Sequence, residues 1–343
     1  MKINWGLIGL GKISNIFAEA FQNTKNSNLL AIASKNDQRL NLFKKKYSIK
    51  SNHCFKDYEK LVKCDKVDVV YISLPNSFHK EWIDKCLFYK KKFLVEKPAF
   101  NNFKDAKEVK DKILKEENFF SEGFMYKFLP QFEKIIELIR NNEIGKITSI
   151  KSIFGVNLIT KKKFFFFEKK RKINPESRLF NKKLGGGCIL DLGCYPISFS
   201  NSLISLQHDI DFEKFIIVDC VKELGETGVD IDARLKYIFN SEIKVEIASS
   251  FKKNIGRKSI IRGTKGTIII DDTWINGKIV SLVKDNNKKE YKFDKIVNPY
   301  TLEIDNVSQS ILNKSLCCLF PGTTFNETLI NTKILNDWIY EKK

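Results

Sequence analysis

The sequence predicts an α/β protein of two domains, the first built on a doubly wound parallel sheet and the second on a large, mainly antiparallel open sheet. Over the first 123 residues, short apolar runs alternate with amphipathic segments, whereas the later strand-like runs are separated mainly by turns. The chain also has 343 residues, more than one hydrophobic core usually serves. We therefore expect a first domain over residues 1–123 and an α/β second domain over residues 124–343.

A regular succession of strands and helices predicts the first domain. Each helical segment has apolar residues three or four positions apart, and each strand-like run is short and apolar. The expected strands cover 3–9, 29–34, 68–74 and 92–97, and the expected helices cover 13–21, 38–47, 79–90 and 103–117, followed by the apolar run FFSEGF (119–124). This alternation predicts a parallel sheet with helices on both faces.

The second domain is predicted from strands that follow one another across turns. These strands cover 145–157, 231–240, 243–251 and 266–272. A basic stretch, TKKKFFFFEKKRKINPESR (160–178), interrupts them, and we predict that it forms a loop. Two interpretations of this loop stay open. Its aromatic residues and lysines bind an anion or a partner, or it is a surface excursion with the aromatic side chains packed underneath.

The formal net charge of +19 invites a nucleic-acid or membrane interpretation. Only seven of the 60 basic residues are arginine, however, and the other 53 are lysine. Proteins that read nucleic acids favour arginine for its bidentate geometry and its stacking. The longest aromatic run, FFFF (164–167), is far shorter than a membrane span. We therefore expect a solvated, lysine-rich surface with no nucleic-acid partner and no membrane segment.

Eight cysteines and three histidines show no spacing typical of a metal site, so no bound metal is expected. The cysteines are predicted to be reduced and mostly buried. The N-terminal residues MKINWGLIGLG lead directly into a strand, without a charged leader or an apolar signal segment. These features predict a soluble, cytoplasmic protein.

A glycine-rich turn, GLGKIS (9–14), follows the first strand and opens the first helix, which is the Rossmann arrangement for binding a dinucleotide. Gly9 permits the tight turn, and Gly11 lets the main chain approach a pyrophosphate. The first helical residues, Lys12 and Ile13, supply amides at the positive end of the helix. Ser14 stands where a third glycine or alanine is usual.

The end of the second strand indicates which dinucleotide binds. An NAD site usually has a carboxylate there to hold the ribose hydroxyls. Here the strand ends in Ser34 and Lys35, and Arg39 follows. A hydroxyl and two cations attract a 2′-phosphate, and Asp37 is expected to cap the next helix instead. The sequence therefore predicts NADP(H) as the cofactor.

Lys97 is the candidate for chemistry at the other end of the cofactor. It lies in FLVEKP (93–98), at the carboxyl end of a predicted strand, where open α/β sheets bind ligands. A lysine is ordinarily solvated, but this one is held between Glu96 and Pro98. We expect its charge to lie beside the nicotinamide.

With these motifs in place, the chain resembles the Gfo/Idh/MocA oxidoreductases, which include glucose–fructose oxidoreductase, inositol dehydrogenase and dimeric dihydrodiol dehydrogenase. The resemblance runs nearly from end to end, and the VEKP and glycine-rich segments together make it specific. The matching segments are WGLIGLGKIS (5–14), LPNSFH (74–79), VEKP (95–98), EGFMYKFLPQ (122–131), RLFNKKLGGGCILDLGCYPI (178–197) and IIRGTKGTIII (260–270).

The resemblance implies a second domain whose open sheet faces the cofactor and often builds a homodimer or higher oligomer. It places Lys97 near the hydride acceptor, with Asp191 and Tyr195 from the glycine-rich segment. Tyr195 stands where many members have histidine. In this respect the chain resembles the branch of dihydrodiol dehydrogenase and glucose–fructose oxidoreductase, whose members use NADP.

The expected chemistry is a proton transfer that accompanies hydride transfer. Gly185–Gly187 are expected to let a helix start pack against nicotinamide and substrate, and Asp191 and Tyr195, four residues apart, to share a helix face. A tyrosine with a pKa near 10 donates a proton at neutral pH, and the Lys97 ammonium favours its phenolate. We assign Tyr195 as acid–base, Lys97 as its electrostatic partner and Asp191 as orienter. The alternatives are a buried aromatic role for Tyr195 and a capping role for Asp191.

Further site residues come from the resemblance alone. Glu96 is expected beside the cofactor with Lys97. Lys127 stands where the family usually has arginine, near the cofactor, and Leu129 replaces a common histidine. Arg178 either contacts the substrate, together with Lys97, Asp191 and Tyr195, or pins its own loop. Leu74, Asn76 and His79 match the loop that borders the nicotinamide ribose, although His79 is equally interpretable as a helix-start residue.

The sequence thus predicts an NADP(H)-dependent oxidoreductase that acts on a sugar, a sugar derivative, a cyclic polyol or a vicinal diol. Two other classes stay open. One is a non-catalytic NADP-binding redox sensor or regulator, which would need neither Lys97 nor Tyr195. The other is a polyanion-binding protein, for which only the net charge argues.

Overall fold

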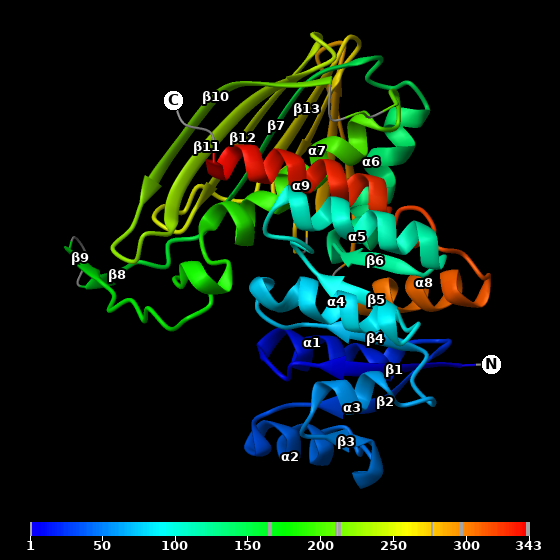
Figure 1. The fold of residues 1–343 in the computed structure, drawn as a ribbon. Coiled ribbons are helices and arrows are strands. Elements are labelled where there is room, and N and C mark those ends of the chain that lie inside the picture. Colours follow the sequence, from blue (N-terminus) through cyan, green and yellow to red (C-terminus); the bar gives the residue numbers. More distant parts are fainter. Residues whose placement is uncertain are drawn as a thin grey trace. The chain divides into compact units, whose positions relative to one another are not determined.

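A computed structural model describes residues 2–163, 167–209, 211, 214–275, 277–294 and 298–340 (Figure 1). The chain forms two compact units. The first comprises residues 1–129 and 297–329, and the second comprises residues 130–296 and 330–343. The domain boundary that the sequence predicts between residues 123 and 124 remains a prediction.

The structure groups the segment 297–329 with the first unit, although the sequence-based division gave it to the second domain. The reason is the packing of helix α8 (Tyr300–Leu312). Trp5 Nε1 donates to Ser308 Oγ at 3.0 Å, and Ser27 Oγ lies 2.7 Å from the same oxygen. All three groups are buried. Contacts that join positions about 300 residues apart leave no local trace in the sequence.

The first unit contains a six-stranded sheet in the order β3-β2-β1-β4-β5-β6, with every pair parallel. This order is that of a doubly wound sheet, and it reverses between β1 and β4, where such sheets bind their ligands. The prediction of the fold is therefore confirmed. The strands are β1 (Ile3–Ile8), β2 (Ser27–Ala33), β3 (Cys54–Phe55), β4 (Val69–Ile72), β5 (Lys92–Glu96) and β6 (Phe120–Gly123).

The remaining helices of the first unit connect these strands in βαβ fashion. They are α1 (Lys12–Ala20), α2 (Asp37–Lys46), α3 (Tyr58–Val62), α4 (His79–Phe88) and α5 (Phe103–Glu116). Strand β4 is buried along its whole length, as expected for a strand covered on both faces. The ring of Phe17 stacks on that of Tyr71 with centroids 3.7 Å apart, which packs α1 onto β4.

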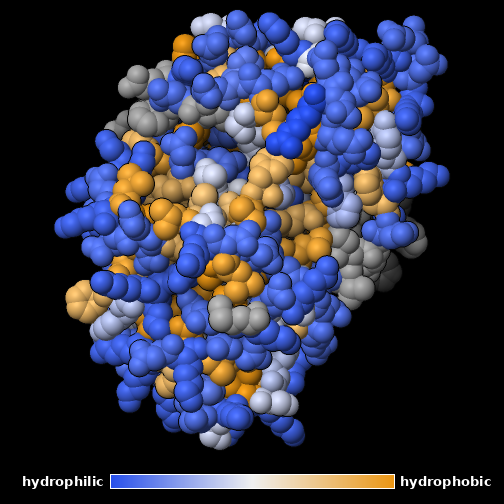
Figure 2. Space-filling view, turned by 90° about the vertical axis from the view of Figure 1, so that its right-hand side faces the viewer, coloured by the Kyte–Doolittle hydropathy of each residue, from blue (hydrophilic) through white to orange (hydrophobic). Residues whose placement is uncertain are grey.

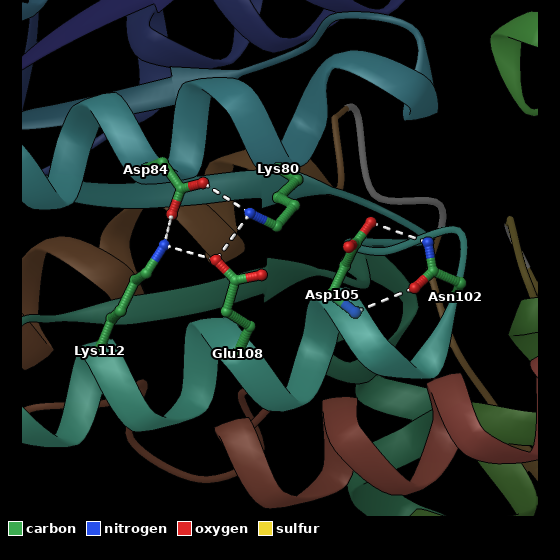
Figure 3. A network of polar contacts seen from close by, with 6 residues as sticks. All are labelled: Lys80, Asp84, Asn102, Asp105, Glu108 and Lys112. Carbon is green, nitrogen blue, oxygen red and sulfur yellow. Dashed lines mark hydrogen bonds and ion pairs between the residues drawn. The ribbon is translucent and has the colours of Figure 1, made fainter.

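Helices α4 and α5 are joined by a network of charges (Figure 3). Lys80 and Lys112 each bind Asp84, at 2.8 and 2.7 Å, and each also binds Glu108, at 3.1 and 2.8 Å. One exposed pair contributes little, but four shared contacts hold the two helices in one arrangement. Asn102 caps α5 by accepting from the main-chain amide of Asp105. Helix α4 precedes β5 in the chain and α5 follows it, so the network joins the two helices that flank this strand in sequence.

The second unit contains an eight-stranded sheet in the order β10-β11-β12-β7-β13-β14-β15-β16. Every pair is antiparallel except β7 with β12. The four predicted strands are confirmed as β7 (Ile147–Gly155), β11 (Asp230–Phe239), β12 (Ile243–Ser250) and β14 (Thr267–Ile270). The pattern missed β10 (Phe215–Leu224), β13 (Ser259–Gly263), β15 (Ile279–Lys284) and β16 (Asn287–Lys292).

Along β11 and β12, buried and more exposed residues alternate, so one face of this sheet is covered and the other is open. Helices α6 (Pro130–Arg140) and α7 (Cys194–Ile204) pack against the sheet (Figure 1). Helix α9 (Phe325–Tyr340) begins in the first unit, and its residues from Ile330 onward belong to the second.

The prediction of a loop over 160–178 is wrong in part. Strands β8 (Thr160–Lys163) and β9 (Phe167–Lys170) pair in an antiparallel manner, with Thr160 opposite Lys170. A run of lysines and phenylalanines lacks the apolar–polar alternation by which a strand is recognised. Residues 164–166 and the side chains of 162–168 lie outside the described residues, and with them both interpretations of the aromatic run.

The surface is rich in hydrophilic residues, which cover most of the face in Figure 2, while apolar residues appear there as separate patches. Among the lysines whose side chains the structure describes, only Lys127 is buried. All eight cysteines lie within the described residues; none forms a disulfide, and five are buried. No described helix combines the length and apolarity needed to cross a membrane. The described residues also contain no group of three potential metal ligands of the His, Cys, Asp or Glu type.

Candidate active site

The glycine-rich turn lies at the carboxyl edge of the parallel sheet, between β1 and α1. Gly9 has φ +85°, and a Cβ there would lie 2.8 Å from Leu74 Cδ2 and 3.0 Å from the carbonyl oxygen of Ser73. Only glycine fits this conformation and this space. A Cβ at Gly11, by contrast, would meet no atom within 4 Å. The main chain is therefore open at Gly11, where a phosphate can approach.

Ser14 fills the position of the usual third glycine and closes the turn. Its buried hydroxyl lies 2.5 Å from the carbonyl oxygen of Gly9 and 2.7 Å from Ser73 Oγ, and it accepts from the amide of Gly11 at 3.3 Å. Lys12 is exposed and Ile13 half-buried in the first turn of α1. Amides at the start of a helix, with a lysine beside them, favour an anion.

The end of β2 has a hydroxyl, two cations and an aromatic ring. Ser34 is buried, and its Oγ accepts from the amide of Asn36 at 3.1 Å. Lys35 and Arg39 are exposed, and Lys35 Nζ lies 5.7 Å from the centroid of the Tyr58 ring. Burial raises the pKa of Tyr58, and the nearby Arg39 charge opposes that rise. The sequence analysis missed Tyr58 because it lies at the start of α3, after β3.

The expected cap of α2 is wrong by one residue. Asn36 is the capping residue, since its side chain accepts from the amide of Arg39 at 2.9 Å. Asp37 is the first helical residue, and it forms an ion pair with Lys56 at 2.8 Å. Both side chains suit a helix start, so only the main-chain conformation distinguishes them.

The loop after β4 is tied to the loop after β5 by His79. Leu74 lies in the first of these loops, and the buried Asn76 follows it. His79 is the first residue of α4 and is completely buried. Its Nε2 lies 2.9 Å from the carbonyl oxygen of Leu74, and its Nδ1 lies 3.0 Å from that of Pro98. Both ring nitrogens therefore contact the main chain, as befits a residue that positions the two loops.

Lys97 directly follows β5 and is half-buried at the carboxyl edge of the sheet. The buried carboxylate of Glu96 accepts a hydrogen bond from the hydroxyl of Tyr71. Burial raises the pKa of Tyr71 well above its usual value, and the Glu96 charge raises it further. Glu96 is thus directed toward Tyr71 of β4, a partner that local sequence did not indicate.

Lys127 is paired within the protein. Its ammonium lies 2.9 Å from Glu327 Oε1, and only 1% of its side chain is exposed. A buried charge requires such a partner. Its expected contact with the cofactor stays a prediction, and the sequence analysis missed Glu327, 200 residues further along the chain. Leu129 is buried.

In the second unit, the triple glycine Gly185–Gly187 lets the main chain pack closely against other parts of the protein. A Cβ at Gly186 would lie 2.7 Å from the carbonyl oxygens of Arg178 and Leu179, and one at Gly187, with φ +121°, would collide with the Asp230 carboxylate. Asp230 Oδ1 accepts from the amide of Ile189 at 2.6 Å. Burial raises the pKa of Asp230, and this hydrogen bond opposes the rise. Asp230 thus caps the helical segment from a neighbouring strand.

Asp191 and Arg178, both expected at the substrate, bind each other. Arg178 Nη1 lies 2.9 Å from Asp191 Oδ1. Asp191 belongs to a π-helical segment, Ile189–Gly193, that leads directly into α7. The arginine thus pins the loop before the glycines to this segment, which was one of the two roles expected for it.

Tyr195 lies in the first turn of α7, with its ring among aromatic side chains. The ring centroid is 5.3 Å from that of Phe154 and 5.8 Å from that of Trp274. Trp274 is completely buried and is fixed by donation from Nε1 to the carbonyl oxygen of Ile153 at 3.0 Å. Tyr195 itself remains half-buried. These aromatic residues come from β7 and from the turn after β14, and the sequence analysis did not identify them.

Two family models match the chain. The model of an oxidoreductase family with an NAD-binding Rossmann fold matches residues 3–124, and the model of the GFO/IDH/MocA C-terminal domain matches residues 132–269. The chain belongs to the Gfo/Idh/MocA oxidoreductase family. The resemblance drawn from the sequence motifs is thereby confirmed, and so are an NAD-binding type of first domain and an α/β fold overall.

Relatives within the Gfo/Idh/MocA family are dehydrogenases and reductases. Trans-1,2-dihydrobenzene-1,2-diol dehydrogenase of Xenopus tropicalis is 29% identical over 297 residues, which cover 86% of this chain and 82% of that protein. Scyllo-inositol 2-dehydrogenase (NADP(+)) of Bacillus subtilis (strain 168) is 24% identical over 269 residues, covering 78% and 76%. The structure of an aldose–aldose oxidoreductase from Caulobacter crescentus has the same fold, with a TM-score of 0.84 at 19% identity over 99% and 97% of the two chains.

Proposed function

We propose that this chain is an NADP(H)-dependent oxidoreductase that transfers a hydride between the nicotinamide and a carbinol or carbonyl carbon of a sugar, a sugar derivative, a cyclic polyol or a vicinal diol. The observation that carries the proposal is the carboxyl edge of the first sheet. There the open turn at Gly11 follows β1, the cations Lys35 and Arg39 follow β2, and Lys97 follows β5.

The dinucleotide phosphates fit the turn between β1 and α1. The amides of Gly11, Lys12 and Ile13 would hold the pyrophosphate at the start of α1. At the end of β2, the hydroxyl of Ser34 and the charges of Lys35 and Arg39 would hold a 2′-phosphate, with Tyr58 beside them. The nearest acid in sequence, Asp37, is paired with Lys56 at 2.8 Å, and this neighbouring positive charge reduces the repulsion between Asp37 and an anion bound there.

The chemistry combines the cofactor with two side chains of the protein. The bound dinucleotide supplies or accepts the hydride. In the reducing direction, Tyr195 donates its proton to the carbonyl oxygen as that oxygen becomes a hydroxyl; in the oxidising direction, the phenolate accepts the proton of the alcohol. We propose that the Lys97 ammonium acts next to this phenol, where its charge would favour the phenolate. Proton transfer of this kind typically contributes roughly 10²–10⁴-fold in rate.

Two sets of contacts would orient Tyr195. Phe154 and Trp274 contact its ring, with centroid distances of 5.3 and 5.8 Å. The Arg178–Asp191 ion pair holds the π-helical segment from which α7 starts. We propose that Asp191 orients the site and that Arg178 contributes to substrate binding next to it.

The proposed substrate class rests on two points. Tyr195 and Lys97 are proposed to act at a carbinol or carbonyl carbon, and the relatives are named for substrates that carry such carbons. A trans-dihydrodiol and scyllo-inositol both present secondary hydroxyl groups on adjacent ring carbons. We propose a substrate of this kind, which includes sugars.

The assembly and location are also proposals. Strand β10 is an edge strand, and it exposes Ile216, Val218, Val221 and Leu224, each at least half exposed. Such an edge favours association, so we propose a homodimer or higher homo-oligomer through the second sheet. Eight cysteines without a disulfide fit a reducing, cytoplasmic location. Light scattering at micromolar concentration measures the oligomeric state, and a monomer would refute the first proposal.

Oxidation of NADPH tests the function directly. The purified protein is assayed with keto-sugars, nucleotide-linked sugars, dicarbonyls and oxidised cyclic diols, and NADP⁺ reduction is assayed with the matching alcohols. We expect turnover with one of these classes and at least a tenfold preference for NADPH over NADH. A tenfold preference for NADH would overturn the cofactor assignment. Tight NADPH binding without any turnover, unchanged by Lys97→Met and Tyr195→Phe, would favour the redox-sensor alternative.

A further inference from the structure

Glu122, at the end of β6, is a buried carboxyl group that connects two separate segments of the first unit. It is 3% exposed. Its Oε1 accepts from the main-chain amide of Ala99 at 2.9 Å, and its Oε2 accepts from Thr328 Oγ1 at 2.7 Å. Ala99 lies two residues beyond Lys97. One oxygen of the carboxyl group therefore holds the main chain beside the candidate catalytic lysine.

The second partner of Glu122 is itself anchored. Thr328 lies in the first turn of α9, which is fixed by a reciprocal cap. The amide of Thr324 donates to Glu327 Oε2 at 2.8 Å, and the amide of Glu327 donates to Thr324 Oγ1 at 3.3 Å. The other oxygen of Glu327 binds the buried Lys127 at 2.9 Å. Glu122 is thus held by a structured turn.

The other main-chain neighbours of Lys97 are also held by buried side chains. The Glu96 carboxylate accepts from Tyr71 on β4, and the carbonyl oxygen of Pro98 lies 3.0 Å from Nδ1 of His79 on α4. Together with the contact to Ala99, residues 96, 98 and 99 are each tied to a different element. The Lys97 segment is therefore fixed on both sides, and Glu122 is the group that fixes it from β6.

We propose that Glu122 is a positioning residue: by holding the amide of Ala99, it fixes the main chain that presents Lys97, and Thr328 fixes Glu122 in turn. The inference rests on the proposed function, since it matters for catalysis only if Lys97 acts there. Glu122 itself need not touch substrate or cofactor in this role. Its effect is transmitted through three main-chain residues.

The geometry requires an acceptor at Oε1, but it does not require a charge. The Ala99 amide can only donate, whereas the Thr328 hydroxyl can rotate to donate or to accept. Burial raises the pKa of Glu122 to about 7, with the charges of Lys127 lowering it and Glu327 raising it. In the neutral acid, the proton can sit on Oε2 and point to Thr328, which leaves Oε1 free to accept from Ala99. A glutamine reproduces this arrangement with its amide nitrogen toward Thr328.

Hydrogen exchange of the protein without cofactor tests the structural half of the proposal. Glu122→Ala should accelerate exchange of the Ala99 amide on the order of tenfold or more, because that donor loses a buried acceptor. Glu122→Gln should leave the exchange within about threefold of the parent. Thr328→Val, which removes only the second contact and is nearly isosteric, should give an intermediate rate and guards against failure of the alanine variant to fold. Unchanged exchange at Ala99 in both Glu122→Ala and Thr328→Val would overturn the proposal.

Kinetics test the functional half. With NADPH and the substrate found in the panel, Glu122→Ala should lower kcat by roughly 10- to 100-fold, the scale expected of a displaced catalytic group, while NADPH affinity changes less than about threefold. Glu122→Gln should restore kcat to within about threefold. Ser308→Ala is the matched control, because it removes a buried hydrogen bond of the same unit far from the Lys97 segment and should leave kcat unchanged. If Glu122→Ala and Glu122→Gln lower kcat equally, positioning through Ala99 is refuted.

A parallel measurement on Lys97→Met separates the two hypotheses. If Lys97→Met keeps full turnover, the proposed function of Lys97 fails, whatever Glu122 does. If Lys97→Met abolishes turnover and Glu122→Ala leaves kcat intact, the proposed function stands and the positioning role of Glu122 fails.

Discussion

Glu122→Gln should make the stability of the protein less dependent on pH. Burial raises the pKa of the Glu122 carboxyl group from 4.5 to about 7. The folded protein therefore binds this proton more tightly than the unfolded chain does. The contribution of Glu122 to the free energy of unfolding is therefore most favourable below pH 4.5. It becomes less favourable as the pH rises to about 7, and above that pH it levels off.

The size of the effect follows from the shift. About 2.5 pH units at about 1.4 kcal/mol each correspond to roughly 3.5 kcal/mol over the whole interval. Between pH 5 and pH 8, where most of the change falls, we expect roughly 2 to 3 kcal/mol. The carboxyl group is buried, so solvent does not screen it. Glutamine keeps an acceptor for Ala99 and carries no titrating group, so the variant should gain this amount relative to the parent as the pH rises.

Denaturant unfolding of both proteins between pH 5 and pH 8, followed by circular dichroism, measures the difference in their free energies of unfolding. Groups that do not interact with Glu122 contribute equally to the two proteins and cancel in that difference, whereas Lys127 and Glu327, whose charges act on Glu122, belong to the effect that is measured. Glu81→Gln, at an exposed position of α4, controls for the replacement of a glutamate by a glutamine outside the buried site. Parallel pH profiles for the parent and Glu122→Gln would refute the reasoning, as would a parent that gains on the variant toward pH 8.

Three further predictions concern other parts of the molecule. Tyr195→Phe and Lys97→Met should each lower kcat by about 10²-fold or more with NADPH affinity nearly unchanged, and a double variant no worse than either single one would show that the two groups act together. Lys35→Ala and Arg39→Ala should each weaken NADPH binding about tenfold and leave NADH binding unaffected, which competition titrations with the two nucleotides measure; an equal loss for both would contradict a 2′-phosphate site. Glu303 is fully buried, finds no hydrogen-bond partner among the described residues, and has its pKa raised by burial and by the Glu96 charge. Glu303→Leu should therefore raise the free energy of unfolding by about 1–3 kcal/mol, and a lower thermal stability of this variant would show that the site needs a carboxyl group.

Much of the first unit was predictable because its signals are local. A run such as VVYI (69–72) is apolar throughout, since β4 is covered on both faces, and the glycine turn requires a residue without a side chain at Gly9. The second unit was harder. Its edge strand β10 begins with the apolar run FIIV (215–218), which the sequence analysis overlooked. Most residues of this strand are exposed or half-exposed in the structure, so they do not follow the usual rule that an apolar run is buried. The β8–β9 hairpin carries no alternation at all.

The sequence by itself determined the fold class, the family and the positions of the motif residues, because each depends on spacing over a few residues. Only the tertiary structure decided what those residues contact. Asp230 reaches the amide of Ile189 across 41 positions, Glu122 reaches Thr328 across 206, and Lys127 finds its counter-charge across 200. The role of a buried carboxylate depends on the hydrogen-bond donors that contact it. Those donors come from distant chain segments, which are brought together only when the protein folds.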